Sequence, residues 1–448
     1  MKKKHRFSFS TTQLILLSFL FAIIIGSVLL ALPISAADGK AISYIDALFT
    51  ATTATCVTGL VTVPTVTTWS LFGQIVILIL IQIGGLGIIT VMSGFMIFLH
   101  RKMGLADRLL IQDALNLNTL SGLVRFVKKV LLGTFIVEGI GALLYMIVFV
   151  PQFGAKGIWI SVFNSVSAFC NAGIDIISEN SLCDYATNPI INLVTCALII
   201  TSGIGYIVWW DVIRVIKSKQ HRRLSLHSKI VLSTTGILIV TGALAIFIFE
   251  YNNPLTFGNY TLFEKIQASL FQSITTRTAG FAMVPQQNLS TASSLVCILL
   301  MFIGGSPVGT AGGIKTVTIT VLIATAISTI KNKNEVTIFN RALSKTTIKK
   351  AIAVTCMSFA IFFISTVLLS ATAPSASALD IVYETVSATA TVGLTRNLTS
   401  AFNLVGKLII IVTMYLGRIG PISLAIAFHL KKQNENIIQN PTEEISVG

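Results

Sequence analysis

Charged residues are scarce in this sequence. Asp, Glu, Lys and Arg make up 11% of the 448 residues, and apolar residues make up 54%. A soluble globular domain carries about a quarter charged residues, so the composition excludes that class. Apolar runs of about 20 residues recur along the chain, as expected of membrane-spanning helices. The sequence therefore predicts a polytopic membrane protein without a separate soluble domain.

The motifs of metal, disulfide and catalytic sites are also missing. The six cysteines show no CxxC or Cys/His spacing and lie mostly in apolar segments, so we interpret them as packing residues. HExxH, GxSxG and paired intramembrane aspartates are absent, which disfavours an intramembrane enzyme. A structural or receptor subunit would not need the repeats described below.

The net charge of +15 follows membrane topology, and we do not expect nucleic-acid binding. Basic residues gather in alternate short loops, which the positive-inside rule places in the cytoplasm, where they also favour anionic lipid headgroups. With the N-terminus inside, few of the 32 Lys and Arg residues are external: Lys40, Lys156, Lys265, Arg277, Arg396 and Lys407. The basic loops 101–122 and 331–350 are either solvated topology signals or docking sites for a cytosolic partner.

A short, weakly polar segment occurs four times, each time between two apolar runs. The copies are residues 46–60, 159–174, 265–281 and 380–394, and they align on Gly59, Gly173, Gly280 and Gly393. An aromatic residue stands ten places before the glycine in three copies (Phe49, Phe163, Tyr383), whereas Phe271 stands one place later in the third. A hydroxyl stands six places before it in three copies: Thr53, Ser167 and Ser387. Repeats spaced by roughly 105–115 residues suggest four equivalent units around one axis.

Two apolar spans flank each copy. They cover residues 12–32 and 72–99, 127–150 and 191–212, 230–250 and 294–328, and 350–373 and 403–430. The first is long for a cleaved signal peptide, so we expect it to be retained. We predict an all-α membrane protein with eight transmembrane helices and four re-entrant pore helices, arranged as four pseudo-symmetric membrane–pore-loop–membrane repeats around one central pore. The repeats would cover residues 1–100, 101–220, 221–345 and 346–448, with both termini cytoplasmic.

Four re-entrant segments in register suggest an ion pathway. Non-helical backbone at membrane depth is tolerated where it lines a water-filled path, and rings of carbonyls can replace the hydration shell of a cation. Glycine permits the required backbone conformation and keeps side chains out of the lumen. The predicted filter contains Thr55, Cys56, Val57, Thr58, Gly59, Cys170, Asn171, Ala172, Gly173, Arg277, Thr278, Ala279, Gly280, Ala390, Thr391, Val392 and Gly393.

These segments resemble the Trk/Ktr/HKT superfamily of potassium uptake proteins. The resemblance covers essentially the whole chain and is strongest in TCVTGL (55–60), FCNAGI (169–174), TRTAGF (276–281) and TVGL (391–394). It implies that the four glycines carry selectivity for K⁺ bound at backbone carbonyls, since a serine in the first position marks sodium-preferring plant relatives. Cys56 departs from the family pattern, in which Thr is common.

A second resemblance lies in residues 304–315, where glycines and Pro307 exclude a continuous helix. The family implies a gating loop there, formed by Gly304, Gly305, Ser306, Pro307, Gly309, Gly312, Gly313 and Lys315, with Arg418 of the last span facing it. Ser306-Pro307 departs from the small residues usual in the family. A plain kink between packed helices is the alternative for the loop, and a structural or snorkelling role is the alternative for Arg418. Glu138, inside a span, is either functional or bonded only to a neighbouring helix.

The early start of the first span makes the membrane ion-translocating subunit of a bacterial Ktr system the best match. That resemblance implies plasma-membrane potassium uptake, a homodimer, a cytosolic ring of RCK-type nucleotide-binding regulators, and Na⁺ as an activator, with no organic cofactor on this chain. The alternative is a secondary transporter that couples potassium to sodium or proton movement. Such folds usually have inverted repeats and midplane carboxylates, whereas these repeats are parallel.

Overall fold

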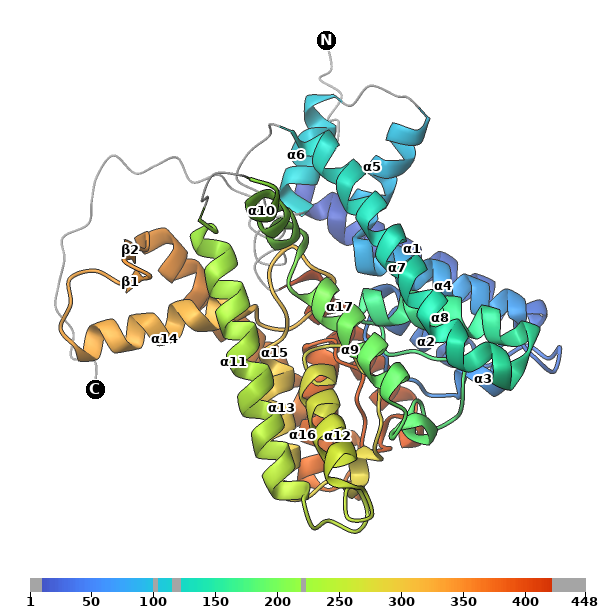
Figure 1. The fold of residues 1–448 in the computed structure, drawn as a ribbon. Helices are drawn as coiled ribbons and strands as arrows, with labels where there is room; N and C mark the ends of the chain where they lie inside the picture. The colour runs from blue at the N-terminus through green and yellow to red at the C-terminus, as the bar shows by residue number, and fades with distance from the viewer. Residues whose placement is uncertain (1–9, 100–103, 115–121, 219–222, 421–448) are drawn as a thin grey trace.

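The computed structural model describes residues 10–99, 104–114, 122–218 and 223–420, and these residues are mostly helical (Figure 1). The first repeat contains α1 (Thr11–Ala31), α2 (Tyr44–Cys56), α4 (Leu71–Leu86) and α5 (Ile88–Phe98). The second contains α7 (Leu123–Phe153), α8 (Ala155–Cys170), α9 (Pro189–Gly203) and α10 (Tyr206–Lys217). The third contains α11 (Leu226–Glu250), α12 (Leu262–Thr275), α13 (Thr291–Phe302) and α14 (Thr316–Ile330). The fourth contains α15 (Lys345–Thr372), α16 (Ala378–Thr389) and α17 (Leu404–Ile419).

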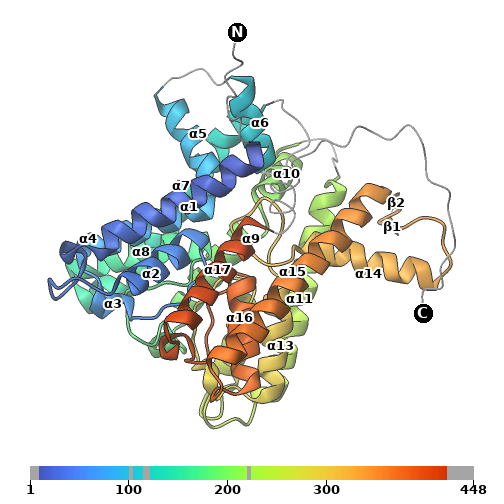
Figure 2. The same cartoon turned by 180° about the vertical axis from the view of Figure 1, so that it is seen from behind.

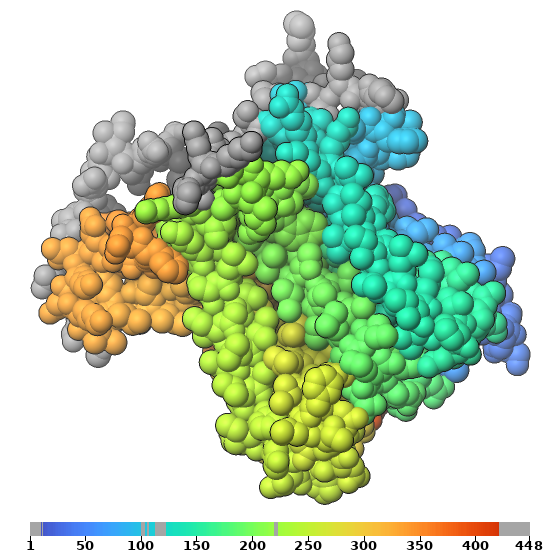
Figure 3. All heavy atoms as spheres, viewed as in Figure 1, coloured from blue at the N-terminus to red at the C-terminus, as the bar shows by residue number. Residues whose placement is uncertain are grey.

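Shorter elements connect these helices. They are α3 (Thr65–Thr68), α6 (Leu105–Ala114), and an antiparallel hairpin of β1 (Thr337–Ile338) and β2 (Arg341–Ala342). Single 3₁₀ turns cover Pro33–Ser35, Cys183–Tyr185, Gln286–Asn288 and Thr399–Ala401. In the space-filling view, α14 and the hairpin form an orange lobe on one side of the molecule (Figure 3). The hairpin lies within the basic loop predicted at 331–350.

The outer helix of each repeat is long and apolar enough to cross a membrane. These helices are α1, α7, α11 and α15. Ser10, Ser225 and Ser344 cap α1, α11 and α15 by accepting a hydrogen bond from a backbone N–H of the first turn, which fixes where each helix begins. Large apolar side chains such as Phe135, Leu143 and Ile147 of α7 remain exposed on the outward surface. An apolar outward surface suits contact with lipid chains.

The repeats follow one another around a ring. The pore helices α2, α8, α12 and α16 each pack against the outer helix of their own repeat. Each inner helix also packs against the next pore helix, as α4 does on α8, α9 on α12, and α13 on α16. The last inner helix, α17, packs against α2 of the first repeat and closes the ring (Figure 2). The predicted fold of four repeats around a common centre is confirmed.

The inner helices differ from the prediction because they are not straight. The predicted span 72–99 is bent by 98° between α4 and α5, and the span 191–212 by 96° between α9 and α10. Gly87 (φ 81°, ψ 133°) and Gly205 (φ 85°, ψ 147°) stand at these bends, and Gly420 (φ 85°, ψ 137°) ends α17 in the same conformation. The third inner helix is interrupted between α13 and α14, as predicted. The remainder of the last predicted span, 421–430, lies outside the described residues.

Candidate ion pathway: a glycine ring and the loop beneath it

The four aligned glycines meet at the centre of the molecule, and we refer to Gly59, Gly173, Gly280 and Gly393 as the glycine ring. A Cβ added to Gly59 would lie 3.1 Å from the Cα of Gly393 and 3.4 Å from the Cα of Gly173. A Cβ on Gly280 would lie 3.1 Å from the Cα of Gly173 and 3.3 Å from the Cα of Gly393. Each ring glycine therefore lies beside the ring glycines of the preceding and the following repeat.

Each ring glycine is preceded by the same strained backbone. All four have positive φ, from 64° at Gly173 to 101° at Gly59. Two residues before each of them stands a non-glycine residue in the left-handed region: Val57, Asn171, Thr278 and Thr391. This conformation costs roughly 1 kcal/mol for a residue with a Cβ. Its fourfold recurrence indicates that the surrounding helices hold these turns in place.

A hydroxyl side chain closes each turn. Gly59 N–H donates to Thr53 Oγ1 (2.9 Å), and Gly393 N–H donates to Ser387 Oγ (3.0 Å). In the other two repeats the hydroxyl donates instead to the carbonyl after the ring glycine, from Ser167 to Ile174 and from Thr275 to Phe281. The hydroxyl that the sequence aligns in three repeats therefore forms a hydrogen bond that holds the turn together.

The irregular third repeat has a simple explanation. Thr275 stands four residues after Phe271, the same separation as between Phe49 and Thr53. It stands only five residues before Gly280, whereas the corresponding hydroxyl stands six before the glycine elsewhere. The third turn is thus one residue shorter between the hydroxyl and the ring, which accounts for the displaced aromatic residue.

The backbone of the ring retains unpaired acceptors. Within the described residues, no donor pairs with the carbonyl oxygens of the four glycines. The buried hydroxyls of Thr55, Thr58 and Thr391 also lack a partner among these residues. Buried polar groups are normally satisfied, so the unpaired glycine carbonyls of the ring suit a bound cation. All four pore helices end within five residues of a ring glycine, which directs their partially negative C-termini toward the site.

Residues 303–315 form a closed loop between α13 and α14, and we refer to them as the intramembrane loop. Its two ends pair with each other, because Gly304 N–H donates to Ile314 O (3.0 Å) and Ile314 N–H donates to Phe302 O (3.1 Å). The Ser306 and Thr316 hydroxyls lie 2.9 Å apart. Lys315 Nζ donates to Ala311 O (2.5 Å) and satisfies a carbonyl inside the loop.

The intramembrane loop packs directly against the residues that precede the ring glycines. Gly312 N–H donates to Thr278 Oγ1 (3.0 Å), and a Cβ on Gly312 would lie 2.5 Å from Ala390 O. Thr278 and Ala390 belong to the deep ends of the third and fourth re-entrant segments. Thr310 Oγ1 donates to Phe169 O of the second pore helix (3.2 Å). The loop thus contacts three of the four re-entrant segments.

The second inner helix and Arg418 hold the other side of the loop. Ser306 N–H donates to Gly203 O (2.9 Å), and Tyr206 N–H donates to Val308 O (2.9 Å). Arg418 Nη1 donates to Thr310 O (2.7 Å), while Nη2 donates to Gly84 O of the first inner helix. Arg418 therefore contacts the loop as the resemblance implied, and its contacts exclude a snorkelling side chain.

Three residues of the predicted filter direct their side chains away from the ring. Cys56 packs in an apolar cluster with Phe49, Leu60 and Met414. Cys170 Sγ lies 3.7 Å from Gln82 Oε1 on α4, and Arg277 reaches Thr235 Oγ1 (3.4 Å) and Gly304 O (3.5 Å). The position of Arg277 in the chain predicts that it belongs to an external segment. In the structure its guanidinium instead reaches Gly304, at the start of the intramembrane loop.

Other contacts were not predicted. The carbonyls of Thr310 and Gly84 accept from Arg418, yet a backbone acceptor leaves no signature in sequence. The Gly84-Gly85 pair inside an apolar run was the one feature of the sequence that indicated close packing of another segment against this helix. In the structure, a Cβ on Gly84 would lie 2.0 Å from Thr55 O. Glu138 accepts from Gln82 Nε2 of α4 (3.1 and 3.3 Å). The hydrogen bond to a neighbouring helix, one of the two interpretations of Glu138, is present.

Comparison with known proteins identifies the family. The family model "TrkH: Cation transport protein" matches residues 2–440. The Ktr system potassium uptake protein B of Bacillus subtilis is 42% identical over 98% of this chain and 97% of its own length. The potassium/sodium uptake protein NtpJ of Enterococcus hirae is 37% identical over 100% of this chain and 99% of its own.

A solved structure supports the architecture independently. The potassium transporter TrkH from Vibrio parahaemolyticus superposes with a TM-score of 0.74, covering 95% of this chain and 87% of that chain. At 18% identity this likeness shows the fold alone. With the whole-chain match to the family model and the sequence relatives, it confirms the resemblance drawn from the four re-entrant segments. The chain belongs to the TrkH family of cation transport proteins, which are membrane transporters and not enzymes.

Proposed function

We propose that this chain takes up potassium across the bacterial plasma membrane through the glycine ring. The convergence of four glycines with unpaired carbonyls carries this proposal, because such a ring replaces water around a cation without a fixed negative charge. The names of the two sequence relatives support potassium as the substrate. In this proposal, the segments 55–59, 170–173, 277–280 and 390–393 form the selectivity filter.

The intramembrane loop acts as the gate in this proposal. It packs against the deep ends of three re-entrant segments, so an ion leaving the ring toward the cytoplasm would meet it first. Arg418 adds a positive charge beside the loop and disfavours cation passage while the two remain in contact. Opening would then require the loop to leave the ring and Arg418 to release Thr310.

The assembly around the chain is also a proposal. Four repeats divided at residues 100, 220 and 345 would form one pore in each subunit of a homodimer. A cytosolic ring of RCK-type subunits would dock on the basic inner surface and bind the regulatory nucleotide. The "Ktr system" name of the Bacillus subtilis relative supports a partner subunit, and the name of NtpJ supports a role for sodium as activator or second ion.

Potassium uptake by a potassium-uptake-deficient bacterium expressing this chain tests the proposal. Growth on low potassium and uptake of ⁸⁶Rb⁺ should be restored, and added sodium should stimulate both. The experiment needs a second arm with an RCK-type subunit co-expressed, since the membrane chain alone could be inactive. No uptake in either arm, with the chain present in the membrane, would contradict the proposal.

Flux coupling distinguishes a channel-like pathway from a secondary transporter. In proteoliposomes, potassium entry through a carbonyl-lined filter should follow the potassium gradient without stoichiometric movement of sodium or protons. Uphill potassium accumulation driven by a sodium or proton gradient alone would favour the secondary transporter.

A further inference from the structure

Polar contacts join neighbouring repeats at the outer ends of the pore helices, and they recur at matching positions. The fourth residue of each inner helix is polar: Gln74 of α4, Asn192 of α9, Ser294 of α13 and Lys407 of α17. Each inner helix packs against the pore helix of the next repeat. Each of these pore helices carries a second polar or aromatic residue 13 or 14 residues before its ring glycine. In the same order of junctions, these residues are Trp159, Gln267, Asp380 and Asp46.

Two of these pairs are in direct contact. Trp159 Nε1 donates to Gln74 Oε1 (2.8 Å), which joins the first repeat to the second. Lys407 Nζ donates to Asp46 Oδ1 (2.6 Å), which joins the fourth repeat to the first. The Lys407 and Asp46 side chains are only 16% and 14% exposed, so water screens this ion pair less than a surface pair.

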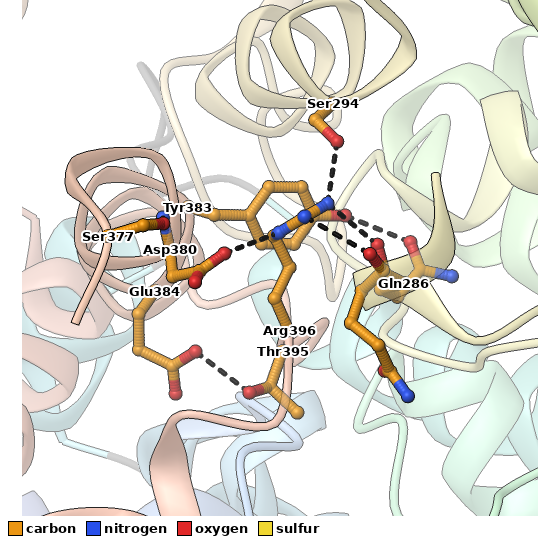
Figure 4. A network of polar contacts seen from close by, with 9 residues as sticks. Gln286, Ser294, Ser377, Asp380, Tyr383, Glu384, Thr395 and Arg396 are labelled. Carbon is orange, nitrogen blue, oxygen red and sulfur yellow. Dashed lines mark hydrogen bonds and ion pairs between the residues drawn. The ribbon is translucent and has the colours of Figure 1, made fainter. Parts of the chain in front are cut away.

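The other two pairs are joined through an intermediate group. Arg396 donates to Asp380 Oδ1 (2.6 Å) and Ser294 Oγ (2.8 Å), and thus links the third repeat to the fourth (Figure 4). It also donates to Gln286 O (2.9 Å), beside the hydroxyl of Tyr383 (Figure 4). Between the second and third repeats, Asn192 Nδ2 (3.0 Å) and Gln267 Nε2 (3.3 Å) both donate to Ala186 O.

We propose that these four links form a clamp ring that sets the spacing of the pore helices and, through them, the width of the glycine ring. The clamp ring comprises Gln74–Trp159, Asn192–Gln267, Ser294–Arg396–Asp380 and Lys407–Asp46. Its members act as positioning residues, because the ring glycine lies 13 or 14 residues farther along each pore helix. The pore helices are rigid bodies in a close-packed interior, so a displacement at the outer end is transmitted to the ring.

The chemistry of the four links differs although their positions match. One link is an ion pair, one an ion pair extended by a serine, and two are neutral. Hydrophobic packing alone would stabilise the assembly without fixing the rotation of each pore helix. A directional contact at each junction fixes that rotation and thereby the approach of the glycines. The inference rests on the proposed potassium uptake, whose selectivity it assigns partly to residues outside the filter.

The Lys407–Asp46 pair offers the sharpest test. The variants are Lys407→Met, Asp46→Asn, and the double variant Asp46→Lys with Lys407→Asp, each compared with wild type for the ratio of ⁸⁶Rb⁺ to ²²Na⁺ uptake. Lys156→Met is the matched control, because Lys156 is an exposed lysine at the start of α8. Each single variant should lower the ratio by about threefold or more, as expected for coupled neighbours, and the exchanged pair should recover most of it.

Several outcomes decide the inference. Single variants with less folded protein but an unchanged ion ratio would show that the clamp ring only stabilises the fold, and would overturn it. An exchanged pair no more selective than either single variant would also contradict it. If these charge variants fail to reach the membrane, Trp159→Phe removes the Nε1 donor together with part of the aromatic ring and should lower the ratio in the same direction. Absence of uptake by wild type itself would instead contradict the proposed function.

Discussion

Arg418 connects the intramembrane loop to the first and the last inner helix. Its guanidinium donates to Thr310 O of the loop and to Gly84 O of the first inner helix. A planar guanidinium can reach both carbonyls at once, whereas a lysine ammonium on a flexible stem cannot hold both with the same geometry. The sequence predicted a charged side chain deep inside the last span, because a lone arginine in an apolar run is conspicuous. It could not predict the carbonyl partners.

Replacing Arg418 should loosen the loop. We expect Arg418→Gln to raise the maximal rate of ⁸⁶Rb⁺ uptake several-fold, since both charge-assisted hydrogen bonds and the positive charge are lost. Arg418→Lys keeps the charge and should give an intermediate rate. Uptake rates normalised to the amount of chain in the membrane provide the measurement. A rate at or below that of wild type in Arg418→Gln would argue against a restraining role.

Side-chain direction in the filter was not predictable from the aligned segments. Cys56 and Cys170 each end a pore helix and occupy the same position relative to the ring glycine, so the predicted filter includes both residues. The structure places both thiols behind the turn, against neighbouring helices. Alignment on the glycines identifies which backbone lines the ring, because the repeats share it. The direction of each side chain depends on the helix packed behind it.

At the scale of single elements, the bends of the inner helices are the main feature that the sequence did not reveal. Each glycine in an apolar helix costs only about 1 kcal/mol relative to alanine, so Gly87 and Gly205 did not interrupt the predicted spans even with other glycines close by. The third inner helix was recognised because several glycines and a proline occur together. The bends share one backbone conformation, which only a comparison in three dimensions shows.

The bend at Gly205 also forms the seat of the intramembrane loop. A Cβ on Gly205 would lie 2.5 Å from Pro307 O, whereas a Cβ on Gly87 would meet nothing closer than 3.9 Å. Both glycines have similar positive φ and extended ψ, a conformation nearly restricted to glycine, so an alanine at either position costs roughly 1 to 3 kcal/mol of backbone strain. Gly205→Ala should add a clash with the loop.

The two alanine variants therefore form a matched pair. Gly87→Ala and Gly205→Ala should both lower the thermal unfolding temperature of the purified protein, and Gly205→Ala should lower it further and change the uptake rate. Thermal unfolding in detergent and ⁸⁶Rb⁺ uptake measure the two effects. Equal shifts and equal uptake in both variants would show that the loop does not depend on this seat.

At the scale of the whole molecule, the order of repeats was predictable and the contacts between them were not. Spacing and register predicted four equivalent units, and α17 packing on α2 completes their circle. Pairs such as Lys407 and Asp46 lie more than three hundred residues apart in the chain, so no local pattern relates them. The charge distribution predicted orientation, which the helix arrangement alone does not test.

Thiol labelling tests that orientation. In a Cys356→Ser background, which removes the exposed native thiol, Asp38→Cys should react with a membrane-impermeant maleimide in intact cells. Glu335→Cys, in the basic loop between α14 and α15, should react only after permeabilisation. The reverse pattern would invert the predicted topology and place the intramembrane loop on the external side of the glycine ring.

The central claim is that the glycine ring itself selects potassium, and the ratio of ⁸⁶Rb⁺ to ²²Na⁺ uptake in Gly59→Ser and Gly280→Ser tests it most directly. A Cβ would lie 2.6 Å from Ala172 O at Gly59 and 2.4 Å from Val392 O at Gly280, so either serine must displace a neighbouring filter carbonyl. Gly139→Ser is the control, because a Cβ on Gly139 of α7 meets nothing within 4 Å. We predict reduced rubidium uptake or increased sodium entry in both ring variants and a normal ratio in the control. Wild-type selectivity in both ring variants would contradict the claim.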